Sequence, residues 1–181
     1  MYGLVNQAIE DLVRSNHGDA TWEVIKQRAE VETEAFLGME EYPDDVTYRL
    51  VQAAAEVLNT PSEEFLRAFG EYWVLYTAKK GYGEMLTMAG KNLPEFLQNL
   101  DTLHTRVGVI MPNLRPPSFS CTEMSEHSLH LHYYTHREGL APFVIGLVQG
   151  LGKMFGTEAE VHHIKGYHTG EDHDVFYISW K

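Results

Sequence analysis

The sequence predicts an α+β fold, in which an N-terminal helical part precedes a C-terminal antiparallel sheet with a packed helix. In the first two thirds of the 181 residues, apolar side chains recur every three or four positions, as amphipathic helices require. In the last third, prolines exclude a continuing helix and residues begin to alternate between apolar and polar. The length favours one domain, 1–181, with a helical part over about 1–60 and a helix and sheet part over about 61–181.

Apolar stripes predict five helices, which lie around residues 5–13, 22–29, 46–58, 65–76 and 93–107. The fourth begins at Thr60-Pro61-Ser62-Glu63, where the threonine can cap the helix and the proline suits its first turn. Asn92-Leu93-Pro94-Glu95 repeats this capping pattern before the fifth helix. Gly81 and Gly83 interrupt the chain between these two helices, and Gly108 is expected to end the fifth.

The residues from Ser128 to Arg137 alternate in character, which predicts a strand. Five side chains share the face that we expect to be buried: Leu129, Leu131, Tyr133, Thr135 and Arg137. A buried helix follows over residues 142–155. Two further strands are expected over residues 159–164 and 175–180, joined by a hairpin turn at His168-Thr169-Gly170-Glu171-Asp172.

Composition and charge exclude several classes of protein. Acidic residues outnumber Lys and Arg by 26 to 14, so the net charge of −12 offers no basic surface to a nucleic acid. A single cysteine, Cys121, excludes an internal disulfide framework and any zinc site with two thiolates from this chain. The longest strongly apolar run, residues 140–148, is about half a membrane span, and we expect a cytoplasmic protein without a membrane partner.

Seven acids and no Lys or Arg lie within residues 30–45. Such a run is typical of a solvated loop or helix face, and that is the structure we expect for it. A docking face for a partner protein is the alternative.

His104 lies on the apolar stripe of the fifth helix, in phase with Leu97, Leu100 and Val107. Two interpretations remain open. The imidazole is either a core histidine hydrogen-bonded to a neighbour, or a neutral ligand that points into an apolar cavity and binds a metal or haem iron.

Tyr133, Thr135 and Arg137 project the same way along the predicted strand. A phenol, a hydroxyl and a guanidinium on one face make a binding surface for a carboxylate or phosphate. Because these groups share the predicted inner face, the arginine needs an anionic partner. The alternative is an edge strand with Arg137 in solvent.

Eight of the ten histidines lie between His127 and His173. A zinc or nickel site is conceivable there, although no HxxxH on a helix and no CxxC motif supports it. Solvated histidines without a shared role are the alternative.

The chain resembles the H-NOX family, the haem nitric oxide/oxygen binding domains that soluble guanylate cyclases also carry. The resemblance rests on His104 with the later Tyr133-x-Thr135-x-Arg137, on Pro116-Pro117, and on Met1-Tyr2-Gly3, Phe69-Gly70-Glu71-Tyr72-Trp73 and Thr169-Gly170-Glu171-Asp172-His173. It implies the H-NOX fold and haem b, with His104 as axial iron ligand and the trio holding the propionates. The family usually has Ser where this chain has Thr135. Pro117 matches the family proline that presses on and distorts the haem.

The resemblance also bears on the choice of gas. Family members that hold O2 use a distal tyrosine on the helix after the trio, and Phe143 takes that place here. One buried donor to a polarised ligand is worth about 1.5–3 kcal/mol, so we expect binding of NO and CO with poor O2 affinity. Val5, Trp73 and Leu147 are expected beside Phe143 around the distal side, and the Trp73 indole is a possible donor.

The resemblance implies a sensor and not an enzyme. NO would weaken the bond between five-coordinate ferrous iron and His104, strain held by Pro117 would relax, and the helical half would shift against the sheet. A separate signalling protein, such as a histidine kinase or a cyclic-di-GMP enzyme, would read the change. The family's cysteine-rich zinc site is not expected here. Two alternatives remain: a metal-dependent enzyme using the histidine cluster, and a binding module for a carboxylated apolar ligand.

Overall fold

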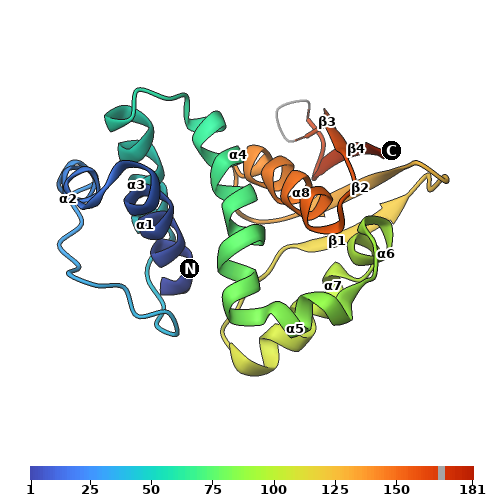
Figure 1. Cartoon of the computed structure of the whole chain (residues 1–181), viewed down its shortest axis with the longest axis horizontal. Coiled ribbons are helices and arrows are strands. Elements are labelled where there is room, and N and C mark those ends of the chain that lie inside the picture. The colour runs from blue at the N-terminus through green and yellow to red at the C-terminus, as the bar shows by residue number, and fades with distance from the viewer. Residues whose placement is uncertain (167–169) are drawn as a thin grey trace.

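The structure, a computed structural model, describes residues 1–166 and 170–181. Its helices are α1 (Gly3–His17), α2 (Asp19–Arg28), α3 (Asp44–Val57), α4 (Ser62–Tyr72), the π-helix η1 (Trp73–Ala78), α5 (Lys79–Ala89), α6 (Leu93–Gln98), α7 (Leu100–Ile110) and α8 (Ala141–Phe155). Its strands are β1 (Ser118–Thr122), β2 (Ser128–Tyr134), β3 (Ala159–Lys165) and β4 (Asp174–Trp180). The predicted α+β order of helices followed by sheet is confirmed (Figure 1).

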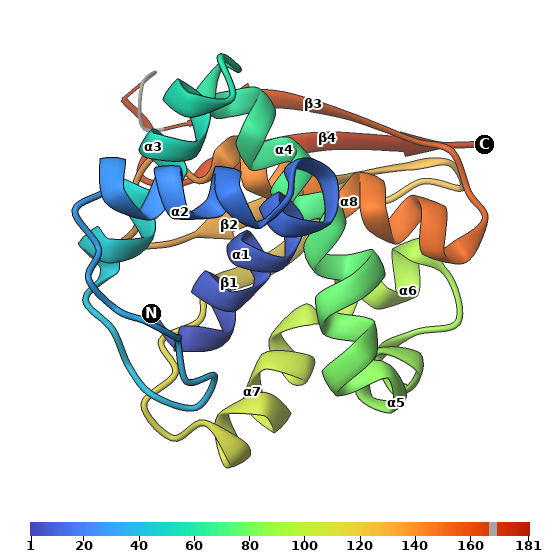
Figure 2. The same cartoon turned by 60° about the vertical axis from the view of Figure 1, so that its left-hand side comes forward.

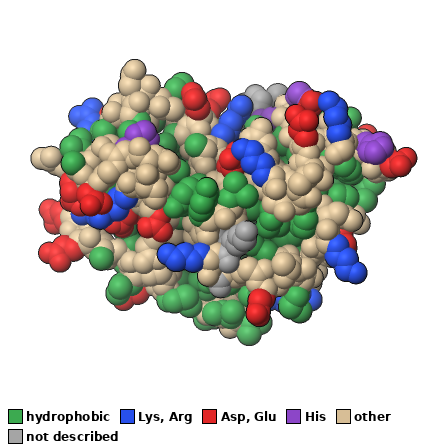
Figure 3. Space-filling model, in the orientation of Figure 1, with side chains coloured by type: hydrophobic (Ala, Val, Ile, Leu, Met, Phe, Trp, Pro, Cys, Tyr) green, Lys and Arg blue, Asp and Glu red, His purple; other side chains and the backbone are tan. Residues whose placement is uncertain are grey.

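The first three helices form a layer of their own at one end of the molecule (Figure 1). Their apolar stripes converge on a core that contains Ile9, Trp22, Ile25 and Leu50, each with no exposed surface. Phe69 of α4 closes the same core. Several acidic side chains lie on the surface of this end (Figure 3). The apolar periods of these segments therefore predicted both the helices and their buried faces.

The predicted fourth helix changes its geometry part-way along. α4 ends at Tyr72 and continues as the π-helix η1, a rare form that recurs near functional sites. The predicted interruption at Gly81 and Gly83 is confirmed, because Tyr82 between them is non-helical (φ −135°, ψ 23°) and kinks α5 before it continues to Ala89. Thr60 is not the predicted cap, since its hydroxyl donates to the Leu58 carbonyl instead.

The predicted fifth helix is two helices. The Asn92 side chain accepts a hydrogen bond from the Glu95 backbone N–H at 2.9 Å, which is the capping contact expected for α6. The chain leaves the helical conformation at Asn99, and α7 begins at Leu100. Gly108 does not end the helix, which continues to Ile110.

The four strands form an antiparallel sheet in the order β1-β2-β4-β3. Leu129 and Leu131 of β2 lie beside Phe176 and Ile178 of β4 on the inner face, and α8 packs on this face to form a second core. β1 was not predicted. β2 ends at Tyr134, three residues before the predicted end of the strand. Residues His168 and Thr169 of the predicted turn lie outside the described residues.

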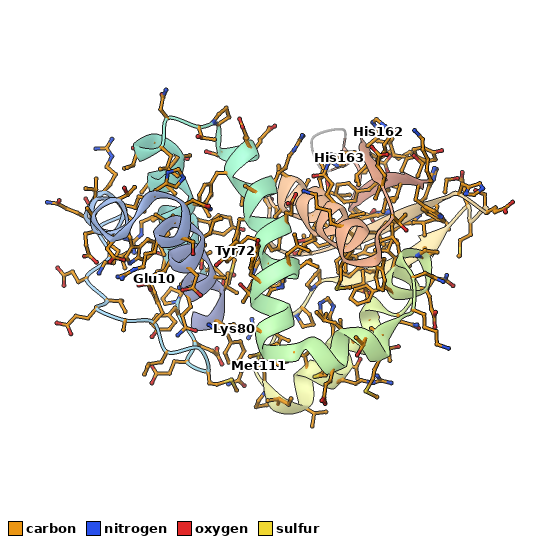
Figure 4. The ribbon with its side chains drawn as sticks, in the orientation of Figure 1. Glu10, Tyr72, Lys80, Met111, His162 and His163 are labelled. Atoms are coloured by element: carbon orange, nitrogen blue, oxygen red, sulfur yellow. The ribbon has the colours of Figure 1, made fainter. Side chains whose placement is uncertain are left out.

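α5 and α7 lie on the opposite side of the molecule from β3 and β4 (Figure 2). Tyr72 of α4 faces the N-terminal helices (Figure 4) and packs against their core. α4 contributes to the first core and α8 to the second, and the two helices pack against each other where the cores meet. Among the described residues, no helix combines the length and apolar character needed to cross a membrane.

Candidate functional site

A cavity of about 1010 Å³ lies between the two cores. This volume is at the upper end of the range of about 300–1,000 Å³ that ligand pockets occupy. Its wall combines α1, α3 and α4 with α7, β2 and α8, and most of its lining side chains are apolar. Every site residue predicted from the sequence lines it: Val5, Trp73, His104, Pro117, Tyr133, Thr135, Arg137, Phe143 and Leu147.

His104 lies on α7 in the wall of the cavity. Its Nδ1 atom is buried without a hydrogen-bond partner among the described residues. Burial lowers the pKa of the imidazole, and the Asp101 carboxylate and the Pro117 carbonyl oppose this effect only in part. The side chain is therefore neutral at pH 7, in the form that can donate a lone pair to a metal. The hydrogen bond between the ring and the Pro117 backbone is the kind of contact considered above for a core histidine, whereas the unpartnered Nδ1 is what a metal ligand offers.

Phe119 of β1 supports the His104 ring. The two ring centroids are 5.8 Å apart, and Phe119 in turn lies 5.2 Å from Tyr133. Asp101, one turn before His104, accepts hydrogen bonds from the Ser118 hydroxyl at 2.8 Å and the Phe119 backbone N–H at 2.7 Å. These contacts tie α7 to β1 and fix the ring at the cavity wall. These contacts could not be predicted from the sequence, because β1 was not predicted.

Tyr133 and Thr135 stand at the end of β2, on the same side of the chain. Tyr133 is 3% exposed, and burial raises the pKa of its phenol to about 12, so it is a neutral donor at pH 7. A hydrogen bond joins it to Thr135. The Thr135 hydroxyl accepts the backbone N–H of Arg137 at 3.0 Å, which turns the chain out of the strand. The predicted strand geometry therefore holds for Tyr133 but not for Thr135 and Arg137.

Arg137 already has an acidic partner within the chain. Its Nε donates to the Asp44 carboxylate at 2.7 Å, and its Nη1 donates to the Arg115 carbonyl at 2.8 Å. The same carboxylate accepts from the Met1 ammonium group at 2.5 Å. The side chain of Arg137 is only 16% exposed, so it does not lie in solvent as the alternative of an exposed edge strand required. Its Nη2 is not used in these bonds.

Asp44 is the site residue that the sequence did not identify, because it was grouped with the solvated acids of residues 30–45. Burial alone would raise the pKa of this carboxyl group, but hydrogen bonds from Met1 and Arg137 outweigh that effect and lower it. Asp44 is therefore ionised at pH 7. No period or motif links it to Arg137, 93 positions away.

The proximity of these groups decides what the cavity can hold. A neutral imidazole with an unpartnered nitrogen fits a metal, and the surrounding apolar wall fits a large flat apolar molecule. The phenol, the hydroxyl and the guanidinium are groups that can bind anionic groups at its edge. Haem combines these three properties, so the residues present fit that group.

The histidine cluster gives no comparable site. Within residues 1–166 and 170–181, no group of three or more His, Cys, Asp or Glu side chains is arranged to hold a metal ion. His162 and His163 lie on β3 at the edge of the sheet (Figure 4). His163 is bonded to the Asp174 carboxylate at 2.8 Å.

The Haem-NO-binding (HNOB) family model matches residues 2–163 of the chain. The chain belongs to this family, the H-NOX proteins. It is 33% identical over 194 aligned residues to soluble guanylate cyclase gcy-35 of Caenorhabditis elegans, an alignment that covers 99% of this chain and 27% of that protein. It is 38% identical over 93 residues to the guanylate cyclase soluble subunit beta-2 of Rattus norvegicus, which covers 51% of this chain and 14% of that protein.

Solved H-NOX structures have the same fold. An H-NOX protein from S. oneidensis in the Fe(II)NO ligation state superimposes with a TM-score of 0.90 at 20% identity, covering 100% of this chain and 99% of that one. An unliganded Fe(II) H-NOX protein from K. algicida gives a TM-score of 0.86 at 23% identity, covering 100% and 97% of the two chains. The predicted family and fold class are thus confirmed.

H-NOX domains bind haem and act as sensor domains without a catalytic centre of their own. The chain spans about a quarter of the length of the first curated relatives that it matches. The matched part of those guanylate cyclases is the haem domain.

Proposed function

We propose that residues 1–181 form one H-NOX unit that binds haem b and senses NO and CO with poor affinity for O2. The observation that carries the proposal is His104, a neutral imidazole with an unpartnered buried nitrogen in the wall of an apolar cavity. Haem b is proposed because Cys121 is the chain's sole cysteine, whereas covalent attachment uses a C-x-x-C-H motif. When bound, the ferrous haem supplies the iron atom that takes the gas.

Tyr133, Thr135 and Arg137 would hold the propionates of the haem. Arg137 supplies Nη2 for one carboxylate while Asp44 and the Arg115 carbonyl fix its orientation. Thr135 keeps the hydroxyl of the usual family serine and adds a methyl group. Its hydroxyl accepts the Arg137 backbone N–H and shares a hydrogen bond with Tyr133, so the two side chains would act together at the propionates. Pro117, which lines the cavity close to His104, would press on the haem.

Phe143 would set the choice of gas from the distal side. It lines the cavity from α8, and its ring lies 5.0 Å from that of Phe69, so this part of the wall presents hydrocarbon. NO needs no hydrogen-bond donor there, whereas bound O2 loses about 1.5–3 kcal/mol without one. Trp73, Val5 and Leu147 line the same cavity.

Two connections would carry a change at the haem to the rest of the chain. On one side, release of the His104 side chain acts on α7, which Asp101 ties to β1. On the other, Arg137 links the propionate clamp to Asp44 at the start of α3. A shift of the helical layer against the sheet would stretch the second connection, and a partner would read the resulting surface.

The partner is proposed to be a separate signalling protein or domain, such as a guanylate cyclase, a histidine kinase or a cyclic-di-GMP enzyme. Several relatives are named soluble guanylate cyclases, which supports the first of these. We also propose a cytoplasmic location, where a chain with one cysteine needs no disulfide.

The competing function is a carrier of a carboxylated apolar molecule, since the same cavity and Arg137 would serve it. The ferrous protein, reconstituted with hemin and then reduced, separates the two functions in one absorption measurement. We expect a Soret band that shifts when NO or CO is added and no lasting complex in air-saturated buffer. A protein that stays colourless after reconstitution would refute the proposal, and a stable O2 complex would refute its gas selectivity.

A further inference from the structure

The outer face of the sheet carries a chain of hydrogen bonds that the proposed haem site does not use. The Thr122 hydroxyl lies 2.7 Å from His132 Nε2, and His132 Nδ1 lies 2.9 Å from His173 Nε2. His173 Nδ1 lies 2.6 Å from the Asp172 carboxylate. All four imidazole nitrogens are thus engaged in one continuous line.

The ends of the line fix where its protons sit. The Asp172 carboxylate accepts only, so His173 Nδ1 donates to it and His173 Nε2 accepts from His132 Nδ1. Thr122 then donates to His132 Nε2. One added proton is accommodated, because the Thr122 oxygen can turn and accept from His132. A second added proton places N–H groups on both facing nitrogens, which breaks the ring-to-ring bond and sets two cations side by side.

This line is attached to the propionate clamp. His132 and Tyr134 flank Tyr133 in β2, and Asp174, directly after His173, pairs with Tyr133 across the sheet. The His173 ring stacks on Tyr134 with 4.2 Å between centroids, and its side chain is 16% exposed. The contacts of His173 therefore hold the start of β4 against the strand that carries Tyr133.

The groups that face the two rings are known for the described residues. Burial lowers the pKa of His132 most, followed by His173, by His130 on β2 and by Lys165 on β3, whereas Glu123 raises it. Tyr134 faces His173 from β2, and Asp172 precedes it. The hydrogen bond from His173 lowers the pKa of the Asp172 carboxyl, which is therefore ionised at neutral and mildly acidic pH. His162 and His163 lie beyond β4 on β3 and are not in the line (Figure 4).

We propose that His132 and His173 form an acid-operated latch, which keeps its bonds through the first protonation and opens on the second. Opening frees residues 170–173 and the first residues of β4, and loosens the end of β2 that holds the haem propionates. The latch itself follows from the sheet alone. Only its consequence at the haem rests on the proposed function.

Nitrogen-15 NMR of histidine-labelled, CO-bound ferrous protein tests the latch directly. At about pH 8 we expect both His132 and His173 in the Nδ1–H form, which is the less common tautomer of free histidine, and two separate titration steps on acidification. Amide exchange at residues 174–176 should rise with the second step. Independent single titrations of the two rings, or an Nε2–H form of either, would overturn the proposal. If no haem binds, the same spectra of the haem-free protein still decide it.

Haem loss to an excess of a haem-scavenging apoprotein tests the consequence. Between about pH 7.5 and pH 5.5, the loss rate of the parent protein should rise about fivefold more than that of His173→Gln, as the loss of one net hydrogen bond allows. His162→Gln is the matched control, since His162 lies on β3 outside the line. Equal acid acceleration in the parent and in His173→Gln, or an equal change in His162→Gln, would contradict the coupling.

Discussion

The Asp44 carboxylate is expected to join the helical layer to the propionate clamp, and Asp44→Asn tests this. The substitution keeps the shape of the side chain and removes the charge that accepts from Met1 at 2.5 Å and from Arg137 at 2.7 Å. A hydrogen bond to a charged group is worth about 1.5–3 kcal/mol when buried. Asp44 is 35% exposed, so solvent screening reduces the expected loss for both bonds together to about 1–2 kcal/mol.

Thermal unfolding of the CO-bound protein measures this loss. For a domain of this length, about 1–2 kcal/mol corresponds to a fall in Tm of about 2–8 °C. Asp45→Asn is the matched control, because the neighbouring carboxylate is 65% exposed and, within the described part of the chain, pairs with Arg49 on its own helix at 3.2 Å. We expect a change within about 0.5 kcal/mol for that variant. Equal effects of the two substitutions would refute the argument.

The pH dependence of the stability provides a second test of the Asp44 contribution. Because the folded-state pKa of Asp44 lies below the ordinary value of 3.8, its contribution is complete above that value and is lost as the pH falls through the folded pKa. The stability difference between the parent and Asp44→Asn should therefore persist at neutral pH and disappear only in strong acid. A difference that vanishes near neutrality would indicate another cause.

Three further predictions concern packing, thiol reactivity and gas selectivity. A Cβ at Gly146 would overlap the Arg67 carbonyl where α8 crosses α4, so Gly146→Ala should lower the free energy of unfolding by denaturant by about 1–3 kcal/mol. Gly108→Ala is the control and should cost nothing, because the space around Gly108 is open. Similar losses in the two variants would contradict this prediction. Burial raises the pKa of Cys121 from 9.0 to about 11. Alkylation of this thiol by iodoacetamide at about pH 8 should therefore be about a hundredfold slower in the folded protein than in the unfolded chain. Equal rates would disprove the pKa shift. Phe143→Tyr should raise O2 affinity about tenfold to a hundredfold, as followed by the decay of the oxygenated spectrum, and an unchanged affinity would remove Phe143 from the distal wall.

The sequence predicted those parts of the site that lie on regular elements. The stripe that contains His104 and the alternation that contains Tyr133 each follow from local period, and both side chains face the cavity. β1 was not predicted because Phe119 and Cys121 are its only apolar residues. The strand is held in place by pairing with β2 and by the hydrogen bond to Asp101. Period carries no information on such contacts.

The arrangement around Arg137 shows a second limit of prediction from the sequence. The need for an anionic partner was predictable from a buried guanidinium, but the identity of that partner was not. Asp44 looks like any acid of a charged loop until the chain brings it and the N-terminus to the clamp. The break at Asn99 and the π-helix at Trp73 likewise have no signal in the apolar period of their segments.

The ligand role of His104 is the claim on which the function depends. His104→Gly, reconstituted with hemin, reduced and kept free of gas, removes the imidazole and leaves Tyr133, Thr135 and Arg137 in place. We predict an altered ferrous absorption spectrum that returns to that of the parent protein when free imidazole is added. A variant whose ferrous spectrum matches the parent without imidazole would contradict the assignment.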